Sequence, residues 1–420
     1  MFFCYLCTCT SLLDMKIRTQ IFIVLLLLSV PLLAQEEPMV SELPQATEDG
    51  LVWPQSMQQR LDEMMRHPLT ETTQLGLMVW DLTDDRSLFS CNHRQLLRPA
   101  STMKLLTAIT ALDQLGPAYN FFTRLYTSGE RVDHVFHGDV CCVGGMDPLF
   151  SFDDMRSFVD ALKSTGIDSL CGRIVTDVSM KDTLRWGEGW CWDDKNPTLT
   201  PLLVGRKDIF APTLANLCEE AGIAVMNNFY IKDQLPKDAV LVAERRTPLT
   251  LILQQMMKDS DNLFAESVFY QVAASSGHRP ARAIDAIRLE RALMERAGLE
   301  SKQYRLADGS GLSLYNYLSA EAEVRLLRYA YRNKRIFNTL YDVLPIAGVD
   351  GTLKKRMKGT AAASNVRAKT GTLTGVISLS GYATAPNGHL LCFAIMNQGT
   401  LKAADARSFQ DQVCQIICEP

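Results

Sequence analysis

Apolar residues recur at intervals of three and four along several stretches of the chain, the spacing that predicts helices with one buried face. These stretches lie at residues 104–112, 152–164, 209–221, 249–257 and 263–274. Strands are predicted within residues 121–146 and at residues 172–178. Two runs rich in Val, Ile, Thr and Tyr predict a β-hairpin over residues 376–383 and 389–396, because Ala385-Pro386-Asn387-Gly388 between them favours a turn. The chain therefore mixes helices and strands as an α/β protein does.

The helix predicted at residues 104–112 begins beside the string Ser101-Thr102-Met103-Lys104. Free backbone N–H groups and the positive dipole end at a helix N-terminus favour a developing negative charge. Lys104 lies one turn after Ser101 on the same face, and a lysine with a lowered pKa can remove the proton of a serine hydroxyl. A capping serine followed by a surface lysine explains the same residues, so this string alone leaves both interpretations open.

Two further strings carry groups that suit an acyl-transfer site. Ser260-Asp261-Asn262 separates two predicted helices, where a hydroxyl and an amide can point into a cleft, although an ordinary capping turn has the same composition. Lys369-Thr370-Gly371 opens the C-terminal strand region. A strand there can offer a cation and a hydroxyl to a carboxylate, while Gly371 allows a close backbone approach; the alternative is a basic edge strand.

The order of the three strings carries more information than any one of them. Ser-x-x-Lys is expected about once or twice by chance in a chain of this length, and Lys-Thr-Gly about 0.1 times. Ser90-Cys91-Asn92 is itself a chance match to the second string. The complete order is typical of serine enzymes that open an amide through an acyl-enzyme, and it predicts that chemistry here.

Longer strings surround these motifs: RPASTMKLLTAITALDQLGPAYNFFTRLY, SDNLFAESV, ADGSGLSLYNYLSA, LPIAGVDGTLKKRM and VRAKTGTLTGVISLSGYA. From about Leu75 to the C-terminus, the chain resembles the D-alanyl-D-alanine carboxypeptidase/endopeptidase family, the class C low-molecular-mass penicillin-binding proteins. The resemblance implies a serine β-lactamase/transpeptidase-like domain, with an antiparallel sheet covered by helices, and an inserted α+β domain.

The resemblance also implies a role for each residue of the motifs. Ser101 would be the acylated nucleophile and Lys104 its proton acceptor. Ser260 and Asn262 would relay a proton to the leaving group and hold the substrate amide. The expected catalytic residues are Ser101, Lys104, Ser260, Asn262 and Lys369, and the expected substrate-binding residues are Thr370, Gly371, Thr372 and Asp147. Among these, Lys369 and Thr370 would bind a terminal carboxylate, and the backbone N–H groups of Ser101 and Thr372 would form an oxyanion hole.

The long separation between Lys104 and Ser260 predicts a domain inserted between motifs that meet in one cleft. We expect residues 51–119 and 247–420 to form a discontinuous catalytic domain and residues 120–246 the inserted accessory domain. The family usually carries a further small domain within the insertion. It is not expected here, because Leu202-Leu203-Val204 runs almost directly into the predicted helix at residues 209–221.

Asp147 lies in the turn Gly144-Gly145-Met146-Asp147-Pro148 of the predicted insertion and has two interpretations. An Asp-Pro turn commonly caps local backbone amides. Alternatively, the insertion folds back over the cleft, and Asp147 faces the amino group of a diamino-acid side chain. The sequence leaves both open.

The N-terminal region has the plan of a secretory signal peptide: Met15-Lys16-Ile17-Arg18, an apolar run at residues 21–33, then Ala34-Gln35. We expect residues 1–34 to be leader and signal peptide, with translation starting at Met15, and residues 35–50 to be a flexible acidic leader. The apolar run is short for a membrane span; a retained anchor with peripheral membrane association stays open. The protein would then work in the periplasm or cell envelope.

Composition narrows the functional class further. A net charge of −4 and 47% hydrophobic residues are typical of a soluble globular enzyme. No part of the sequence is basic enough to suggest nucleic-acid binding. Of 12 cysteines, Cys4, Cys7 and Cys9 precede the signal, and no C-x-x-C pair occurs after it. We therefore predict no metal site and no cofactor, and expect buried free thiols.

The leading prediction is a hydrolase that acts on peptidoglycan stem peptides, at the terminal D-Ala–D-Ala bond or at the D-Ala to diamino-acid cross-link, and that β-lactams inhibit covalently. A β-lactamase or esterase with the same nucleophile is the nearest alternative. No motif assigns a dedicated deacylating carboxylate, and the family resemblance favours the peptidase. A catalytically idle cell-wall-binding protein is the alternative from another class, and the intact motifs argue against it.

Overall fold

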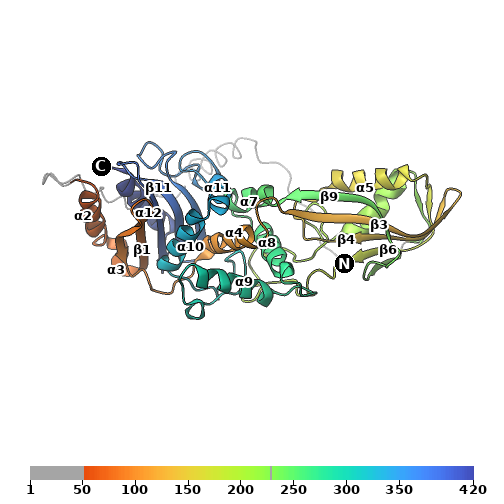
Figure 1. Ribbon diagram of the computed structural model, residues 1–420, viewed down its shortest axis with the longest axis horizontal. Coiled ribbons are helices and arrows are strands. Elements are labelled where there is room, and N and C mark those ends of the chain that lie inside the picture. The colour runs from red at the N-terminus through yellow and green to blue at the C-terminus, as the bar shows by residue number, and fades with distance from the viewer. Residues whose placement is uncertain (1–51, 228) are drawn as a thin grey trace, which may run out of the picture. The chain divides into compact units, whose positions relative to one another are not determined.

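The computed structural model describes residues 52–227 and 229–420, which fold around two β-sheets (Figure 1). The predicted leader and signal peptide (1–34) and the predicted flexible segment (35–50) lie outside the described residues. No helix in the described part of the chain combines the length and apolar character that a membrane crossing requires.

The first sheet joins the beginning and the end of the described chain. Its five strands run antiparallel to their neighbours in the order β10-β11-β12-β1-β2. Their bounds are β1 Gln74–Asp81, β2 Arg86–Cys91, β10 Arg367–Leu373, β11 Val376–Thr384 and β12 Leu390–Gln398. Strand β1 pairs with β12 along its whole length, from Gln74 opposite Gln398 to Asp81 opposite Leu391. Lys369-Thr370-Gly371 consequently lies in an edge strand of this sheet.

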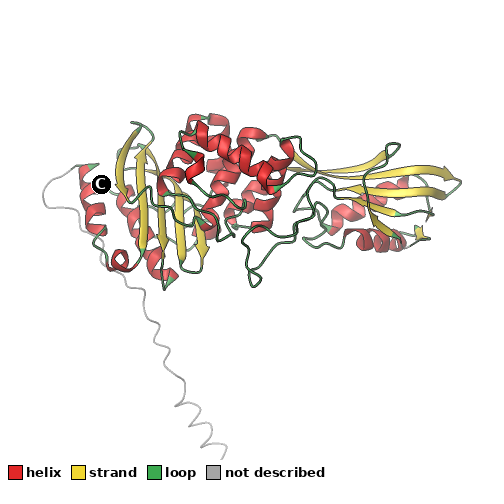
Figure 2. Cartoon of the chain, turned by 90° about the horizontal axis from the view of Figure 1, so that it is seen from below, coloured by secondary structure: helices red, strands yellow, loops and turns green. Residues whose placement is uncertain are grey.

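Helices cover both faces of the first sheet, so its central strands are apolar on both sides. In β1, Leu77 and Val79 contribute to the core beneath α2 (Gln55–Met64), α3 (Pro68–Thr72) and α12 (Ala403–Cys418), whereas Met78 contributes to the opposite core. That opposite core is the larger helical cluster, which Figure 2 shows beside the strands. Its helices are α4 Met103–Gln114, α7 Leu249–Lys258, α8 Asn262–Ser275, α9 Ala283–Arg296, α10 Ala320–Arg332 and α11 Lys334–Val343.

The second sheet is built entirely from the middle of the chain. Strand β4 pairs with three other strands of this sheet, antiparallel with β3 and parallel with β5 and β6. The bounds are β3 Asn120–Val132, β4 Val135–Val143, β5 Ser169–Leu170, β6 Ile174–Asp177, β7 Ala224–Val225, β8 Tyr230–Lys232 and β9 Val240–Pro248. Helices α5 (Phe152–Ser164) and α6 (Phe210–Glu220) share a third core with this sheet.

The chain enters and leaves the second sheet at one place. Asn120, at the start of β3, is paired with Pro248, at the end of β9, and the Leu249 N–H donates to the Tyr119 carbonyl at 2.9 Å. The elements before β3 and after β9 therefore stay together in the helical cluster although more than a hundred residues separate them. The predicted domain bounds at 119/120 and 246/247 stay a prediction.

The predicted elements agree closely with the structure. The helix predicted at residues 152–164 is α5, and the predicted hairpin strands are β11 and β12. The α/β fold class is confirmed as a helix-covered antiparallel sheet accompanied by a second α+β unit. One local feature differs: Ser101 lies in a single 3-10 turn, Ala100–Thr102 (η1), that precedes α4.

Candidate active site

The turn that carries Ser101 is conformationally unusual. Ala100 has φ 50°, in the left-handed region that side chains with a Cβ rarely adopt. Gly311 packs directly on this turn: a Cβ at that position would lie 1.8 Å from the Ala100 carbonyl oxygen, and Gly311 itself has φ +79°. Glycine is thus required at 311 for two reasons, and the Ala100–Ser101 backbone is held from that side.

Strand β10 holds the same turn from the other side, at Gly371. A Cβ there would lie 2.6 Å from the Pro99 carbonyl oxygen and 3.0 Å from the Ser101 backbone nitrogen. Gly371 stands opposite Ser378 of β11, whose hydroxyl donates to the Pro99 carbonyl. The predicted close approach at Gly371 is therefore an approach of β10 to the turn carrying Ser101, with Thr372 one residue further along the strand and exposed.

Lys104 is fully buried beneath Ser101 and makes three hydrogen bonds. Its Nζ lies 2.9 Å from Ser101 Oγ, 2.8 Å from Asn262 Oδ1 and 2.7 Å from the Ser310 carbonyl oxygen. Burial lowers the pKa of Lys104 to about 8, against an opposing effect of the Asp308, Glu266 and Asp261 carboxyl groups. An amine that is easily deprotonated therefore contacts the Ser101 hydroxyl, as a proton acceptor must.

Lys369 occupies the equivalent position beneath Ser260. Its Nζ lies 2.8 Å from Ser260 Oγ and 2.7 Å from the Thr370 carbonyl oxygen. Burial lowers the pKa of Lys369 well below its ordinary value, and the nearby Lys104 lowers it further. The two lysines are buried while Ser101 and Ser260 are partly exposed, so hydroxyl groups rather than ammonium groups line the accessible side.

The Ser260-Asp261-Asn262 junction is shaped by the start of α8. Asp261 is the N-cap, and its side chain accepts from the Leu263 and Phe264 N–H groups. Ser260 has φ 59°, a further left-handed residue at this site. The capping interpretation is thus correct for Asp261, while its neighbours Ser260 and Asn262 point to the two buried lysines.

Eight of the nine predicted site residues lie in the turn-and-strand region just described, and Asp147 does not. Its carboxylate accepts from the Leu149 N–H at 2.9 Å and from the Thr247 hydroxyl at the end of β9. Asp147 is buried, and burial raises its pKa, opposed by the bonds to Thr247 and Leu149. The geometry favours the turn-capping interpretation.

Asp308 organises the glycine-rich loop beside the site. Its buried carboxylate accepts from the Gly311 and Ser313 N–H groups at 2.8 and 2.7 Å. It also accepts from Trp190 Nε1 at 2.8 Å, which ties the segment after β6 to this loop. Because Ser310 in the same loop supplies a carbonyl to Lys104, Asp308 helps to fix the acceptors around that amine.

Several residues around the site were missed from the sequence. Glu266 of α8 accepts from the Ser310 N–H at 2.8 Å, and burial raises its pKa to about 8, assisted by Asp308. Thr352 Oγ1 lies 2.8 Å from Thr370 Oγ1, and Arg206 forms a 2.7 Å ion pair with Asp261. Glu323 of α10 contacts Thr102. The sequence did contain one signal for Glu266 and Glu323: each is an acidic residue among the apolar residues of a helix.

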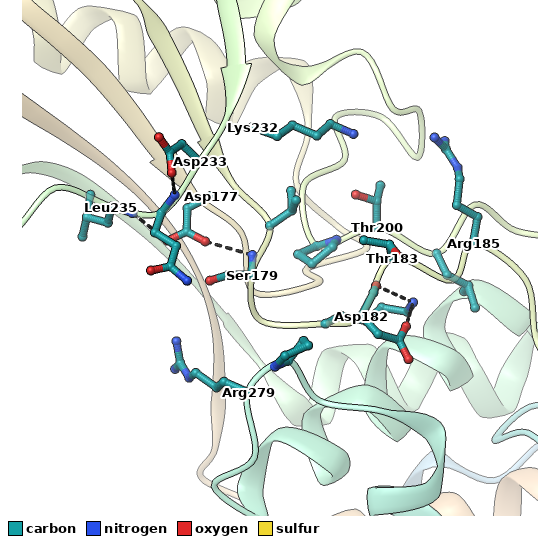
Figure 3. Close-up of a pocket in the computed structure, with 16 residues that line it drawn as sticks. Asp177, Ser179, Asp182, Thr183, Arg185, Thr200, Lys232, Asp233, Leu235 and Arg279 are labelled. Carbon is teal, nitrogen blue, oxygen red and sulfur yellow. Dashed lines mark hydrogen bonds and ion pairs between the residues drawn. The ribbon is translucent and has the colours of Figure 1, made fainter.

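A separate groove of about 770 Å³ lies between the segment after β6 and the loop before α9 (Figure 3). Asp177, Asp182, Lys232, Asp233 and Arg279 are among its lining residues. None of the nine predicted site residues lines it. The groove therefore gives no support to the acyl-transfer chemistry.

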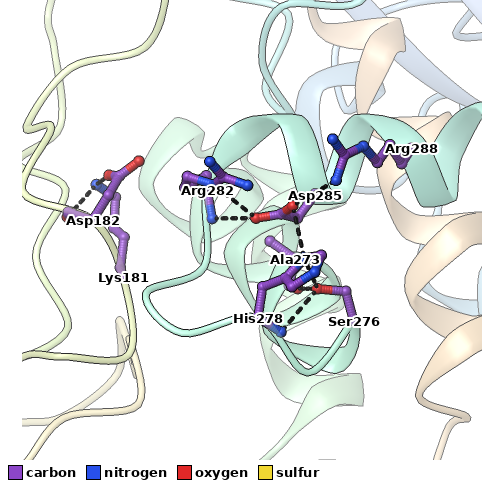
Figure 4. Close-up of polar contacts among 8 residues, drawn as sticks. All are labelled: Lys181, Asp182, Ala273, Ser276, His278, Arg282, Asp285 and Arg288. Carbon is purple, nitrogen blue, oxygen red and sulfur yellow. Dashed lines mark hydrogen bonds and ion pairs between the residues drawn. The ribbon is translucent and has the colours of Figure 1, made fainter.

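Figure 4 shows the polar contacts of the neighbouring segments, with Lys181 and Asp182 on one and His278, Arg282 and Asp285 on the other. The Ala281 N–H and carbonyl bond to the Met180 carbonyl and the Asp182 N–H at 2.8 and 3.1 Å. Beside it, the buried Asp285 carboxylate of α9 accepts from Arg282, Arg288 and His278. The two bonds of Ala281 join the segment after β6 to the loop between α8 and α9, and the bonds of Asp285 link that loop to the start of α9.

Comparisons with known proteins place this geometry in context. The model of the D-Ala-D-Ala carboxypeptidase 3 (S13) family matches residues 57–202 and 205–419. A D-alanyl-D-alanine carboxypeptidase of Haemophilus influenzae is 25% identical over 409 residues, covering 77% of this chain and 85% of the relative. A carboxypeptidase of Mycobacterium tuberculosis is 30% identical over 360 residues, covering 77% and 74%. The crystal structure of penicillin-binding protein 4 from H. influenzae shares the fold, with a TM-score of 0.77 and 23% identity over 84% of this chain and 97% of that one.

Proposed function

Because the chain belongs to the D-Ala-D-Ala carboxypeptidase 3 (S13) family, we propose that it is a serine peptidase that cleaves the D-Ala–D-Ala bond of peptidoglycan stem peptides through an acyl-enzyme at Ser101. The observation that carries this proposal is the contact of the buried Lys104 amine with Ser101 Oγ at 2.9 Å. A hydroxyl beside an amine that can lose its proton near neutral pH is the arrangement that nucleophilic catalysis requires.

Acylation uses the unprotonated form of Lys104. With a pKa of about 8, about a tenth of this amine is neutral at pH 7. The neutral nitrogen accepts the Ser101 proton while Oγ attacks the scissile carbonyl, and the backbone N–H groups of Ser101 and Thr372 bind the resulting oxyanion. Ser260, which contacts Lys369, is placed to pass a proton to the departing D-alanine, and Asn262 is placed to hold the substrate amide.

Lys369 and Thr370 are assigned to the terminal carboxylate of the substrate. Burial disfavours the charged form of Lys369, and an arriving carboxylate would restore it by a charge-assisted hydrogen bond. The charge on Lys369 is thus best stabilised when the substrate is bound. A contact of Asp147 with the amino group of a diamino-acid side chain stays a hypothesis, which Asp147→Asn tests against the turn-capping role.

A β-lactamase is the competing assignment for the same nucleophile. Among the described residues, Ser101 Oγ has Lys104 as its side-chain partner and no carboxylate hydrogen-bonded to it. Without a carboxylate to activate water, a β-lactam adduct should be long-lived. The penicillin-binding protein 4 of H. influenzae has been solved with a β-lactam bound, which supports β-lactams as covalent inhibitors of this chain.

The family acts on the cell wall, so we place the protein in the cell envelope and propose export to the periplasm through the predicted signal peptide. We further propose cleavage near Ala34, with residues 120–246 as an accessory domain on a catalytic domain of residues 51–119 and 247–420. The mass of the mature protein checks the cleavage: a chain that keeps residues 15–34 would be anchored instead.

Incubation with penicillin followed by intact-mass measurement tests the nucleophile. The wild-type chain should gain the mass of one penicillin, and Ser101→Ala should gain none while unfolding at the same temperature. Ser90→Ala is a matched control, because Ser90 belongs to the chance Ser-x-Asn match, and it should label normally. Labelling that survives Ser101→Ala would show that another residue is acylated. Product analysis on a cross-linked muropeptide then distinguishes carboxypeptidase from endopeptidase action.

A further inference from the structure

Glu323 is an acidic side chain buried directly behind the turn that carries Ser101. It lies in the first turn of α10 and is 1% exposed. It shares the buried face of the helix with Leu327 and Ala330, four and seven residues further on. A carboxyl on such a face is costly unless it is hydrogen-bonded, so its partners decide what it does.

Thr102, the residue after Ser101, is the partner of Glu323. Thr102 Oγ1 is in hydrogen-bond contact with Glu323 Oε1 and lies 2.8 Å from the Pro99 carbonyl oxygen. The Ser378 hydroxyl of β11 reaches the same carbonyl. Glu323 is therefore connected through the Thr102 hydroxyl to Pro99, the residue that precedes the strained turn.

No cationic side chain of the described residues compensates a negative charge at Glu323. Its Oε2 has no hydrogen-bond partner within the described residues, and the nearby Ser380 hydroxyl donates to the Phe393 carbonyl at 3.1 Å. Burial raises the pKa of Glu323 to about 7, and the hydroxyls of Thr102 and Ser380 oppose the shift without any contribution from a charged group. The neutral carboxylic acid is thus the form that this pocket favours at and below neutral pH.

Other buried titratable groups occur on the elements packed against α10, and each has a hydrogen-bond partner other than Glu323. They are Asp81 of β1 with His389, Lys104 of α4 with Ser101, Asp285 of α9 with Arg282, Glu290 of α9 with Thr107, Tyr382 of β11 with the Leu327 carbonyl, and Cys392 of β12 with the Val324 carbonyl. On α10 itself, Glu321 pairs with Arg94 and Arg325. Glu323 is therefore expected to titrate independently of these groups.

Proton counting gives the direction of the hydrogen bonds. The Pro99 carbonyl can only accept, and the Thr102 hydroxyl has one proton to give. If Thr102 donates to Pro99, Glu323 must carry the proton of the Glu323–Thr102 contact. If Glu323 ionises, its carboxylate can only accept, so the Thr102 hydroxyl donates to Glu323 and its hydrogen bond to the Pro99 carbonyl is lost.

We propose that Glu323 is a positioning residue: its protonated carboxyl orients the Thr102 hydroxyl onto the Pro99 carbonyl and so holds the turn that presents Ser101 for acylation. The inference rests on the proposed role of Ser101 as nucleophile. Ionisation of Glu323 releases Thr102 from Pro99 and slows acylation, although no atom of Glu323 touches the substrate.

The test measures the second-order rate constant of acylation by a fluorescent penicillin from pH 5.5 to 9. Glu323→Gln keeps a donor to Thr102 but cannot ionise. Its rate should match that of the wild-type chain within about twofold at pH 6, and the ratio of the Glu323→Gln rate to the wild-type rate should rise about tenfold between pH 6 and pH 8. The ratio cancels the effect of Lys104, because both proteins contain it.

Three further variants make the outcome decisive. Glu321→Gln, two residues earlier in α10, should keep the wild-type pH profile. Glu323→Leu fits the apolar face without donating a proton and should acylate about tenfold more slowly at pH 6. Thr102→Val retains the side-chain shape and should remove the alkaline loss, which decides the question even if Glu323→Gln does not fold.

Parallel profiles for the wild-type chain and Glu323→Gln, or an unimpaired Glu323→Leu at pH 6, would overturn the proposal for Glu323. A wild-type chain that is not labelled at any pH would instead overturn the assignment of Ser101. The two failures are therefore distinguishable in one series of measurements.

Discussion

Each serine of the site rests on a buried amine. Lys104 contacts Ser101, and Lys369 contacts Ser260, at 2.9 and 2.8 Å. Removing an ammonium group from water disfavours its charged form, so burial both lowers the two pKa values and leaves the hydroxyls as the exposed groups. A lysine at the surface would stay protonated at neutral pH and could not accept the proton of a serine.

Lys369→Ala tests the proposed binding of the substrate's terminal carboxylate by Lys369. We expect kcat/KM for a D-Ala-terminated peptide to fall about 10- to 100-fold more than kcat/KM for a small neutral ester, because a charge-assisted hydrogen bond contributes about 1.5–3 kcal/mol. Steady-state kinetics on both substrates measure the difference. Lys355→Ala, at an exposed lysine, is the control and should change neither. Equal losses on the two substrates would assign Lys369 to the chemistry, through its contact with Ser260.

At the scale of elements, two glycines allow three segments to meet at Ser101. Gly311 admits the loop after η2 (Ser301–Gln303), and Gly371 admits β10, each at a backbone distance that a Cβ would prevent. The position of Ser101 is thus set by a loop and a strand that approach the η1 turn from two sides. Either contact would have to open if a methyl group were added.

The hairpin that follows β10 is fastened at its far end by an ion pair. His389 Nδ1 lies 2.8 Å from the buried Asp81 carboxylate of β1 and 3.8 Å from Asp84. The side-chain oxygen and nitrogen atoms of these three residues lie within 4.8 Å of one another. The ion pair between His389 and Asp81 is sufficient to explain why they lie so close. It connects the β11–β12 turn to the β1–β2 turn.

His389→Gln should make the stability of the fold less dependent on pH. The hydrogen bond to Asp81 raises the pKa of His389 above its ordinary value. The stabilisation is therefore fully present below about pH 6.5, the pKa of an unfolded histidine, and is lost as the pH rises through the folded pKa. Thermal unfolding between pH 5 and 9 should show a deficit for the variant at acidic pH that shrinks at alkaline pH.

A histidine without such a pair is the control for this comparison. His137 of β4 is exposed and forms no ion pair among the described residues. His137→Gln should follow the wild-type chain at every pH. A constant deficit for His389→Gln across the range would mean that the ring contributes packing, including its edge contact with Trp53, and not charge.

At the scale of the whole molecule, the segment between β6 and α6 contacts the candidate active site at specific residues. Trp190 bonds to Asp308, and Arg206 pairs with Asp261 beside Ser260 and Asn262. Arg206 follows closely on residues 203–204, where the family match is interrupted. The short connection at this place therefore supplies a charged side chain to the surroundings of the site.

Asp147→Asn decides between the two roles considered for this residue. Asp147 accepts hydrogen bonds from the Leu149 N–H in its own turn and from the Thr247 hydroxyl at the end of β9. We therefore expect kcat/KM to change equally for stem peptides with and without a free side-chain amine. Asn preserves an acceptor for Leu149, so the free energy of unfolding should fall by no more than about 1 kcal/mol, whereas Asp147→Ala should cost about 1–3 kcal/mol. A loss confined to the amine-bearing peptide would restore the recognition hypothesis.

The sequence by itself determined the local structure and the chemical inventory. Periodicity predicted α4, α5, α7 and α8 and the β11–β12 hairpin, because the burial of one face leaves a mark on every third, fourth or second residue. The order of the three strings predicted which groups would be assembled. These signals are local, and they do not depend on how the elements pack.

Only the tertiary structure decided how these groups act on one another. Lys104 meets Asn262 across 158 residues, and Lys369 meets Ser260 across 109. The lowered pKa values follow from burial created by that packing. The choice between the two interpretations of Asp147 and the contact of Glu323 with Thr102 also required the tertiary structure. The surroundings of a side chain are set by elements distant in sequence, and no local spacing records them.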